Sequence, residues 1–488
     1  MKKGIQIIAF FILLYSCKPH AQQQGQQLTV QQMQSDYDSL QSALEEAHGG
    51  LYRYSGKNEM DQIFKRYRAQ LDHPMTTLQF VSVIAGLIPE LRDGHLRLEP
   101  DSATSSNLAK ANLFPLRLIA EDAKLKVLLN ETGDDRIIQP GMEITGINGH
   151  QPADLFKLFV SKVSGDGFNE TGKRKKAERG FEALYRILID DDSVFSVTAN
   201  DNTGKTVTAT LNGVLMADRG MNSAANPVNS AINKTLEVLQ GPGENISIRF
   251  ISEGIAALRI RSFTGQNFYE EIDSVFRGVR DRQVKSLIVD LRGNGGGSDY
   301  YGAYVVAQFM RRPFRYFDHI RMRSINPSFT KFRTDAIDDF RSGTVADSTG
   351  GYLLTTKIHN GVGEQAPGKF PFTGKIVVLE DGGTFSTAAD VAALLRHLTK
   401  AIFIGEESGG SYDGNTSGSS ARFIFPYSKL MLNVTMYDYY NAVKPAKNKG
   451  RGTMPDFTVT VTTKELLNGM DSQWEKALQV AKETKYTF

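Results

Sequence analysis

Apolar residues recur every three or four positions in three stretches between residue 28 and about residue 92. This is the spacing of amphipathic helices, and Gly- or Pro-containing turns separate the stretches. The pattern predicts a small N-terminal helical domain at 28–105. Its helices are followed by the turn Arg92-Asp93-Gly94-His95. The periodic positions are Met33, Tyr37, Leu40, Leu44 and Ala47, then Met60, Phe64, Tyr67 and Leu71, then Phe80, Ile84, Leu87 and Leu91.

Between about residues 106 and 215 the pattern changes to short alternating or apolar runs, which predict strands. The segment 139–150 holds the turn Pro140-Gly141, a short strand and the turn Asn148-Gly149. This arrangement resembles the core of a PDZ domain, so we expect a PDZ-like β-rich domain at 106–215. Residues 216–245 are rich in Ala, Asn, Ser and Gly, and we interpret them as a linker.

From residue 246 to residue 488, buried strands alternate with amphipathic helices. Apolar runs at 286–291, 375–380 and 401–404 predict strands, and the first two lead through Gly-rich turns into predicted helices. Alternation of this kind is typical of a mostly parallel sheet with helices packed against it. The sequence therefore predicts a multidomain α/β protein whose C-terminal half is an α/β core.

The amino-acid composition excludes several kinds of function and site. The 488 residues carry 57 Lys and Arg against 54 Asp and Glu, a balance that argues against nucleic-acid binding driven by bulk charge. A single Cys rules out an intramolecular disulfide or a Cys-based zinc cluster. No motif has metal-ligand spacing, so we expect neither a metal nor a cofactor.

The N-terminus has the features of an export signal. Lys2 and Lys3 precede an apolar run that ends in Leu14-Tyr15-Ser16-Cys17, which resembles a bacterial lipobox. We expect 1–16 to be a signal peptide, Cys17 to carry lipid, and 17–27 to be a polar tether. The protein would then be a membrane-anchored lipoprotein of a bacterial cell envelope, facing the periplasm or the exterior. The alternative is cleavage after Ala21, which would discard Cys17.

Two strand–turn–helix junctions carry candidate chemistry. The first, 290–297, ends in Gly295, Gly296 and Gly297, and a run of glycines exposes backbone N–H groups that suit an anion. The second, 380–390, places Ser386 at the start of a helix, where a nucleophilic serine is exposed near backbone amides. Taken singly, the first could be only a tight turn and the second only a helix cap.

Together these motifs resemble the tail-specific, or C-terminal processing, serine peptidases. Val289-Asp290-Leu291-Arg292 with the glycine run resembles the family signature, and Thr384-Phe385-Ser386-Thr387-Ala388 resembles its nucleophile segment. The later motifs at 405–410, at 450–452 and at 455–456 match in kind and order, and the PDZ-like segment and export signal also fit. The resemblance implies a crotonase/ClpP-like core and an exported serine endopeptidase that cleaves polypeptides.

The resemblance also implies which residues act. The better-known members use Ser and Lys, but Ser411 stands near the expected lysine position, so the Ser–Lys dyad is absent. A branch that resembles the tricorn protease core instead uses a His from an Asp-Gly-His turn, which points to His95. His48 is interpreted as a helix-end residue. For the orienting acid the first candidate is Asp438, with Glu406 and Glu407 as alternatives.

The implied mechanism is acyl transfer. Ser386 would attack the scissile carbonyl, His95 would move the proton, and backbone amides of Gly296 or Gly297 and of Thr387 would hold the oxyanion. The PDZ-like segment would hold an extended polypeptide along a sheet edge. The rival interpretation is a non-catalytic protein on the same scaffold that binds a ligand or a peptide.

Overall fold

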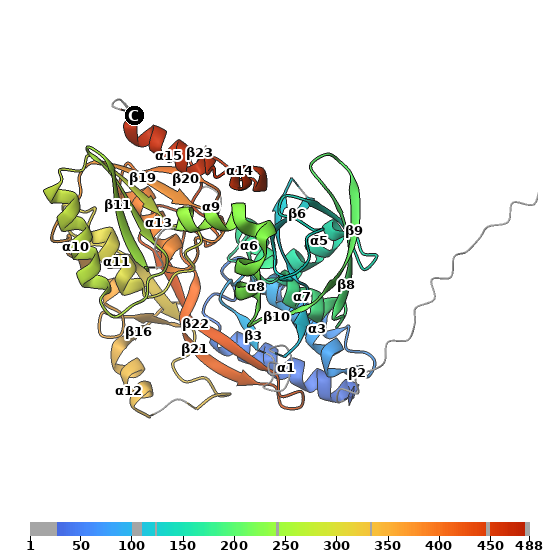
Figure 1. The fold of residues 1–488 in the computed structure, drawn as a ribbon. Helices are drawn as coiled ribbons and strands as arrows, with labels where there is room; N and C mark the ends of the chain where they lie inside the picture. The colour runs from blue at the N-terminus through green and yellow to red at the C-terminus, as the bar shows by residue number, and fades with distance from the viewer. Residues whose placement is uncertain are drawn as a thin grey trace, which may run out of the picture.

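The computed structural model describes residues 27–99, 110–122, 124–240, 244–331, 334–445 and 449–483 (Figure 1). The predicted signal peptide, Cys17 and nearly all of the predicted tether lie outside these ranges. Within them, no helix combines the length and the hydropathy that crossing a bilayer would require. The chain folds into helices and mixed sheets arranged in several units, which confirms the predicted multidomain α/β class.

The C-terminal half is built on a six-stranded sheet in the order β11-β12-β13-β19-β20-β23. All neighbours pair in parallel except β11 with β12, which are joined by a tight turn and run antiparallel. The parallel strands therefore end along one edge of the sheet. The strands are β11 (Ile246–Ser252), β12 (Ile255–Ile260), β13 (Ser286–Asp290), β19 (Lys375–Glu380), β20 (Ile402–Gly405) and β23 (Phe457–Thr458).

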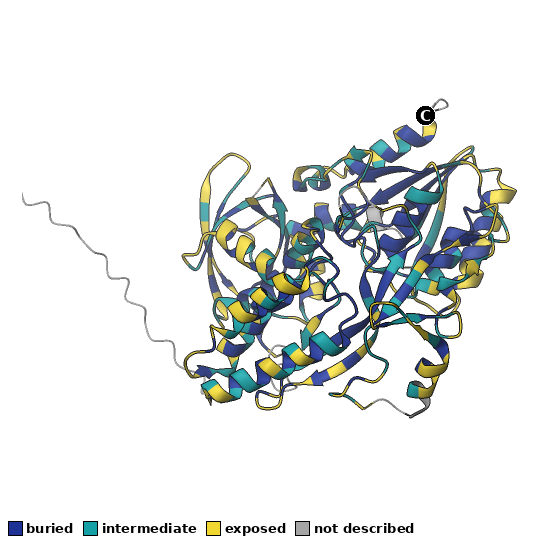
Figure 2. Ribbon diagram, turned by 180° about the vertical axis from the view of Figure 1, so that it is seen from behind, coloured by how far each residue is buried: buried dark blue, intermediate teal, exposed yellow. Residues whose placement is uncertain are grey.

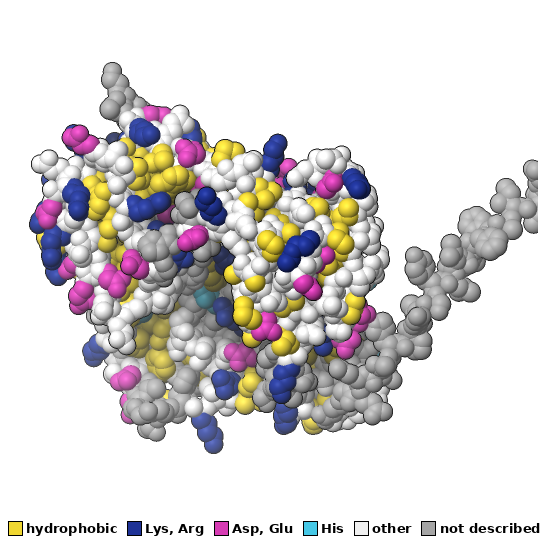
Figure 3. All heavy atoms as spheres, viewed as in Figure 1, with side chains coloured by type: hydrophobic (Ala, Val, Ile, Leu, Met, Phe, Trp, Pro, Cys, Tyr) yellow, Lys and Arg dark blue, Asp and Glu magenta, His cyan; other side chains and the backbone are white. Residues whose placement is uncertain are grey.

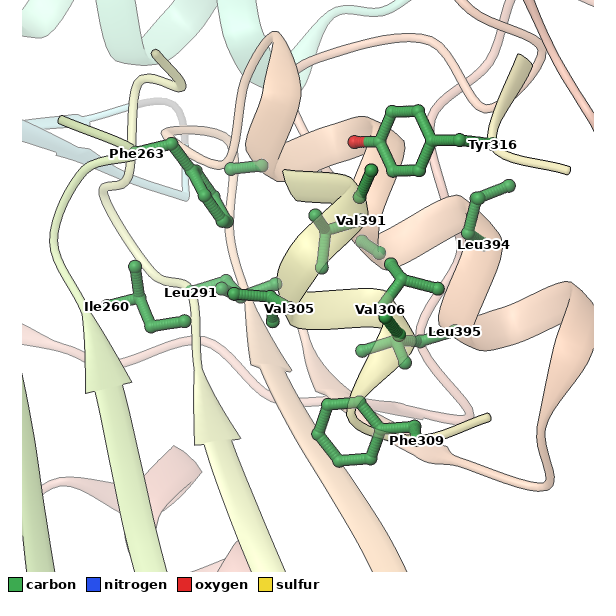
Figure 4. Close-up of a cluster of buried hydrophobic side chains, with 14 of the residues drawn as sticks. Ile260, Phe263, Leu291, Val305, Val306, Phe309, Tyr316, Val391, Leu394 and Leu395 are labelled. Atoms are coloured by element: carbon green, nitrogen blue, oxygen red, sulfur yellow. The ribbon is translucent and has the colours of Figure 1, made fainter. Parts of the chain in front are cut away.

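Helices bury both faces of this sheet, which explains why its central strands are apolar throughout. Val289 and Val378 face the core formed with helices α10, α11 and α13, whereas Ile288 and Val377 face α15. Figure 4 shows side chains of α11 and α13 interlocked beside the strand ends, and Figure 2 shows the strands buried beneath partly exposed helices. The helices are α10 (Phe268–Asp281), α11 (Asp299–Ala307), α13 (Thr387–Leu398), α14 (Thr463–Leu467) and α15 (Ser472–Lys482).

A second sheet joins the core to the N-terminal helices. Its long strand β22 contributes Met436 and Tyr439 to the main core and Leu432 and Val434 to the core of the helical unit. The helices predicted for the N-terminus are present. Their core is completed by residues of the antiparallel pair β21–β22, and not by residues 28–105 alone. The strands are β16 (Thr344–Ala346), β17 (Tyr352–Leu354), β15 (Phe317–Met322), β22 (Met431–Asn441) and β21 (Thr416–Ile424), with β3 (Arg97–Glu99) paired to β22.

The N-terminal unit consists of three helices and a short 3-10 turn that leads into the Asp93-Gly94-His95 segment. Capping boxes at Thr29 and Thr76 start two of the helices. A two-residue strand pair closes the unit. Its elements are β1 (Gln27–Leu28), α1 (Val30–Ala47), α2 (Lys57–Arg68), β2 (Met75–Thr76), α3 (Thr77–Leu87) and η1 (Ile88–Leu91).

The middle unit is a five-stranded antiparallel sheet in the order β5-β6-β7-β8-β9, with helices packed on it. The β-rich character agrees with the sequence, but α6 and α7 were not predicted from it. The elements are β4 (Asn112–Leu113), β5 (Leu116–Glu121), β6 (Lys124–Asn130), β7 (Glu143–Ile147), α5 (Pro152–Lys162), α6 (Thr171–Arg179), α7 (Phe181–Leu188), β8 (Val194–Asn200), β9 (Thr206–Asn212) and β10 (Val214–Leu215).

The segment expected as a linker is helical over much of its length. Helix α8 (Arg219–Ala225), the short η2 (Pro227–Asn229) and α9 (Ser230–Gln240) follow the middle unit. Ile232 of α9 packs with Leu129 of β6 and Leu466 of α14. This connection therefore buries apolar side chains and braces the middle unit against the core. Further elements of the core are β14 (Phe314–Arg315), α12 (Thr334–Gly343), η3 (Asn360–Val362) and β18 (Glu364–Gln365).

Candidate active site

Ser386 lies at the sharp turn between β19 and α13. Its backbone angles, φ 55° and ψ −133°, fall in a region that residues other than glycine rarely adopt. Such a conformation costs on the order of 1–3 kcal/mol, and it is tolerated mainly where function demands it. Its side chain makes no capping hydrogen bond to α13. The helix-cap interpretation therefore does not account for this serine.

Hydrogen bonds hold the two glycine-containing turns together. Thr384 Oγ1 donates to the carbonyl of Leu291 over 2.9 Å, and the amide of Phe385 donates to the carbonyl of Asn294 over 2.9 Å. The amide of Gly293 in turn donates to Asp381 Oδ1 over 2.8 Å. The turns follow adjacent parallel strands, β13 and β19, so their proximity follows from sheet order. The result is a rigid floor beneath Ser386.

The predicted oxyanion donors surround this serine, but they are not equivalent. The amide of Gly296 is already bound to Asn294 Oδ1 at 2.9 Å. Across the described residues, the amides of Gly297 and Thr387 have no hydrogen-bond partner. Thr387 Oγ1 donates to the carbonyl of Gly297 over 2.8 Å, which fixes these two segments side by side. Gly297 and Thr387 are therefore the available donors, and Gly296 is not.

Gly296 has a different role, which is steric. Its φ is 100°, and a Cβ on it would lie 2.6 Å from Ser386 Cβ and 3.0 Å from the amide nitrogen of Thr387. Only glycine adopts this conformation readily and leaves the required space. Gly296 thus allows the first turn to touch the back of Ser386.

His95 reaches Ser386 from the other side. Its Nε2 lies 3.0 Å from Ser386 Oγ, a hydrogen bond between residues 291 positions apart. The imidazole stacks on the ring of Phe385 with centroids 4.6 Å apart. Burial lowers the pKa of His95, and the charges of Asp166 and Asp93 oppose that shift. A lowered pKa favours the neutral imidazole, which can accept a proton at neutral pH.

Asp93 organises the turn that carries His95. Its Oδ1 accepts from the amides of His95 and Leu96, and its Oδ2 accepts from Thr435 Oγ1 and pairs with His48 Nε2 at 2.9 Å. Burial alone would raise the pKa of Asp93, but the hydrogen bond with His48 holds it below its usual value. His48 is the C-cap residue of α1, as predicted, and also holds Asp93.

A second carboxylate, Asp166, comes from the α5–α6 loop of the middle unit. Its Oδ1 accepts from the amide of Gly94 over 2.8 Å. Lys176 of α6 donates to the carbonyls of Gly94 and Ser164, at 2.8 Å and 3.0 Å, and lies 4.6 Å from the ring centre of Phe385. Lys176 belongs to the basic run Lys173-Arg174-Lys175-Lys176, which thus contributes one lysine to the site. In the space-filling view a recess separates the core from the middle unit, and a histidine side chain shows inside it (Figure 3).

Two of the three acids considered from the sequence, Asp438 and Glu407, form ion pairs elsewhere. Asp438 accepts a hydrogen bond from Arg53 Nη1 in a buried ion pair. Side chains alternate between the faces of a strand, so Asp438 faces away from Thr435, the β22 residue that touches Asp93. Glu407 pairs with Arg451. Burial raises the pKa of Glu406, and nearby Lys175 partly offsets this. The prediction that Asp438 orients His95 is therefore corrected by the geometry.

One group in the described part of the chain has the spacing of a metal site. Asp93, His95 and Asp166 each offer a ligand atom, and these atoms lie within 4.8 Å of one another. Both oxygens of Asp93 already accept two hydrogen bonds each, so a cation would have to displace several of them. The arrangement fits a proton-handling group better than a metal site.

Sequence reasoning missed Asp166 and Lys176. Neither lies in a motif that marks catalysis, and both approach His95 only because the middle unit docks on the Asp93-Gly94-His95 turn. The one usable signal was glycine at position 94, where a Cβ would lie 2.7 Å from Asp166 Oδ1 and 2.8 Å from the Phe385 ring.

Residues 254–459 match peptidase family S41. No curated protein matches the chain. Three solved structures of a protein named CPAF are similar to it. The mature form has a TM-score of 0.66 at 15% identity, covering 93% of this chain and 97% of that chain.

The other two structures agree with the first. A serine-to-alanine mutant of CPAF has a TM-score of 0.68 at 13% identity, covering 94% of this chain and 99% of that chain. Mature CPAF complexed with lactacystin has a TM-score of 0.64 at 14% identity, covering 93% and 98%. At these identities the likeness concerns the fold, and it extends over nearly the whole length of both chains.

Proposed function

Residues 254–459 form a peptidase family S41 domain, and the chain is a serine-type peptidase; from this premise we propose that Ser386 is its nucleophile and His95 its general base. The observation that carries the proposal is the 3.0 Å contact between His95 Nε2 and Ser386 Oγ. That distance is within the reach a base needs to take the serine proton. The strained backbone of Ser386 and the neighbouring amides support the same assignment.

The reaction follows from this geometry. Ser386 Oγ attacks the carbonyl carbon of the scissile bond while His95 Nε2 takes the hydroxyl proton. The carbonyl oxygen becomes an oxyanion, for which the free amides of Gly297 and Thr387 are the donors. His95 then passes the proton to the leaving amine, which leaves an acyl-enzyme on Ser386. Water, deprotonated by His95, releases the second product and restores the serine.

The substrate would be an extended polypeptide. The middle unit would hold it, in the manner of a PDZ domain, by adding a strand to one edge of its sheet, where β5 and β9 are the outer strands. Because the α5–α6 loop of this unit is hydrogen-bonded to Gly94, next to His95, a polypeptide held there would lie near Ser386. We assign the chain to the branch that uses Ser with His, because no lysine occupies the position that the Ser–Lys members use.

The site is tested by covalent labelling. A fluorophosphonate probe should label the parent protein on Ser386, and a peptide-library digest should show cleavage. Ser386→Ala should abolish labelling and lower peptidase activity by roughly a thousandfold or more, with the melting temperature unchanged or raised.

Thr384→Ala is the matched control, because Thr384 stands two residues away in the same turn and holds the carbonyl of Leu291. This variant should lose stability and keep labelling. If Ser386→Ala still cleaved unfolded protein as fast as the parent, the nucleophile would be wrong. A non-catalytic binding protein on this scaffold would then be the better explanation.

We also propose that the protein is exported and anchored through lipid on Cys17 to a bacterial cell envelope. The support is the basic start, the apolar run and the lipobox-like Leu14-Tyr15-Ser16-Cys17. Cys17→Ala should release the protein from the membrane fraction or block its processing, as fractionation and mass spectrometry would show. Because one acyl chain anchors only marginally, several acyl chains per Cys17 are expected. Unchanged mass and unchanged membrane association would rule lipidation out.

A further inference from the structure

Two buried polar atoms beside the base lack hydrogen-bond partners among the described residues. They are Nδ1 of His95 and Oδ2 of Asp166. Asp166 is 2% exposed, so water does not readily satisfy its free oxygen. Leaving a buried donor or acceptor unpaired is costly, so each of these atoms has a hydrogen-bonding position that a partner would satisfy. Atoms of His95, Asp166 and Asp93 lie within 4.8 Å of one another.

Asp93 is the other acid that could serve Nδ1 of His95. Its Oδ1 lies 4.0 Å from that nitrogen, beyond hydrogen-bond distance. Each of its oxygens already accepts two hydrogen bonds, and a carboxylate offers about four acceptor sites in all. Asp93 thus has no free acceptor site for the imidazole. It shapes the turn instead.

We propose that Asp166, supplied by the middle unit, is the positioning acid of the peptidase site: its free Oδ2 accepts a hydrogen bond from Nδ1–H of His95 when substrate is bound. This inference rests on the proposed roles of Ser386 and His95. The two atoms are not within hydrogen-bond distance in this structure, so a side-chain rotation must join them. Catalytic hydrogen bonds are often long or unaligned without substrate. With the proton held on Nδ1, Nε2 remains free to accept the proton of Ser386.

The loop that carries Asp166 is built to hold it in place. The amide of Gly167 donates to the carbonyl of Arg92, and the amide of Phe168 donates to the carbonyl of Gly450. Asn169 Nδ2 donates to the carbonyl of Ser408 over 2.6 Å. Each of these bonds joins the middle unit to a different segment around the site. Asp166 is therefore preorganised by three contacts outside its own unit.

Charge around His95 supports this pairing. The groups whose charges act on the imidazole are Asp166, Asp93, Lys176 and Arg97, and Asp166 exerts the largest of these effects. Burial raises the pKa of Asp166, and the charges of His95 and Lys176 oppose the rise. Lys176 therefore helps to keep the carboxylate ionised beside a base that becomes positive during the reaction.

The test is Asp166→Asn, which keeps the shape and can still accept the hydrogen bond from Gly94. An amide N–H2 facing Nδ1 would favour the tautomer that protonates Nε2, so the base could not accept the serine proton. We expect kcat to fall by about a hundredfold to ten-thousandfold, with little change in KM. The loss of a negative charge should also move the acid limb of the kcat/KM profile to lower pH, because it lowers the pKa of His95.

Asp135→Asn is the matched control, since Asp135 is a hydrogen-bonded acid of the same unit that accepts from Asn130 and Ile138. It should keep the parental kcat and pH profile. Parental values in Asp166→Asn, or a fall explained wholly by unfolding, would overturn the inference. Fluorophosphonate labelling separates the two proposals. Labelling of Ser386 at the parental rate in Asp166→Asn overturns only the role of Asp166, whereas an unlabelled parent overturns the role of Ser386.

Discussion

The two sides of this site are built in different ways. Ser386 is placed by one continuous stretch of chain, in which β19 leads through a turn into α13, and by a neighbouring turn after the adjacent strand β13. His95 is placed by contacts from distant parts of the chain. The turn that carries it is held by Thr435 of β22, by His48 just after α1, and by Asp166 and Lys176 of the middle unit.

Because of this difference, the two sides should respond differently to changes elsewhere in the molecule. Local secondary structure keeps Ser386, the proposed nucleophile, rigid even when other units shift, because the parallel sheet and α13 are buried together. The base depends on the docking of three units, so a change far from Ser386 can displace it. A site assembled in this way is complete only when the N-terminal and middle units are packed on the core.

On the base side, the largest effect is expected from removal of the proposed base itself. His95→Ala should lower kcat/KM by a factor of about a hundred to ten thousand, because proton transfer in the transition state is lost while the turn is retained. Steady-state peptide hydrolysis measures it. Far-UV circular dichroism should be unchanged.

His48→Ala is the comparison variant on the same side of the site. It leaves Asp93 one hydrogen bond short, so unfolding should become easier by about 1–3 kcal/mol while activity falls less than in His95→Ala. A reversed order of the two activities would mean that His48 is the base.

The same contrast explains what the sequence could reveal. Strand, glycine turn and helix follow one another near Ser386, so local pattern predicted where this serine lies and the alternation of apolar residues in the core sheet. The family resemblance then marked it as the nucleophile. His95 emerged only from a resemblance to a family motif. Asp166 could not emerge, because an isolated acid in a loop has no periodicity, and its role depends on how the middle unit docks.

The acid chosen from the sequence shows the limit most clearly. Asp438 stands at a suitable separation from Ser386 along the chain, but separation does not fix which face of a strand a residue occupies. Thr435 and Asp438 lie three residues apart on β22 and therefore face opposite ways. Helices α8 and α9 were missed for a related reason. Their small polar residues are typical of a linker, and only the tertiary structure shows that Ile232 is buried.

An intermediate effect is expected on the nucleophile side from Gly296→Ala. The added Cβ would lie 2.6 Å from Ser386 Cβ, and the φ of 100° disfavours any side chain. Ser386 must shift, and a displacement of about 1 Å can cost roughly a hundredfold in rate. Labelling by a fluorophosphonate should slow by a similar factor.

Gly295→Ala is the control for that substitution. A Cβ at this neighbouring position would meet nothing within 4 Å. Its labelling rate should match the parent. Equal rates in the two variants would show that the first glycine turn does not press on the nucleophile, which would weaken the contrast between a rigid nucleophile side and an assembled base side.

The smallest effect on chemistry, with a large effect on stability, is expected for Asp438→Asn. Arg53 and Asp438 are each 2% exposed in their side chains, and Arg53 also donates to the carbonyls of Tyr439 and Asp413. Removing one charge of a buried pair leaves the other uncompensated, which costs about 3–5 kcal/mol. Urea unfolding should therefore show a clearly lower midpoint, whereas kcat per folded molecule should stay close to the parental value.

Asp61→Asn provides the matched control, because Asp61 pairs with Lys57 on the exposed face of α2 and should leave the unfolding midpoint nearly unchanged. The reason for expecting normal chemistry in Asp438→Asn is geometric. The Asp438 carboxylate accepts from Arg53 on one face of β22, whereas Thr435 donates to Asp93 on the other face. A loss of kcat at constant stability would instead couple Asp438 to His95 through the strand. The base side would then depend on one more distant residue than its contacts indicate.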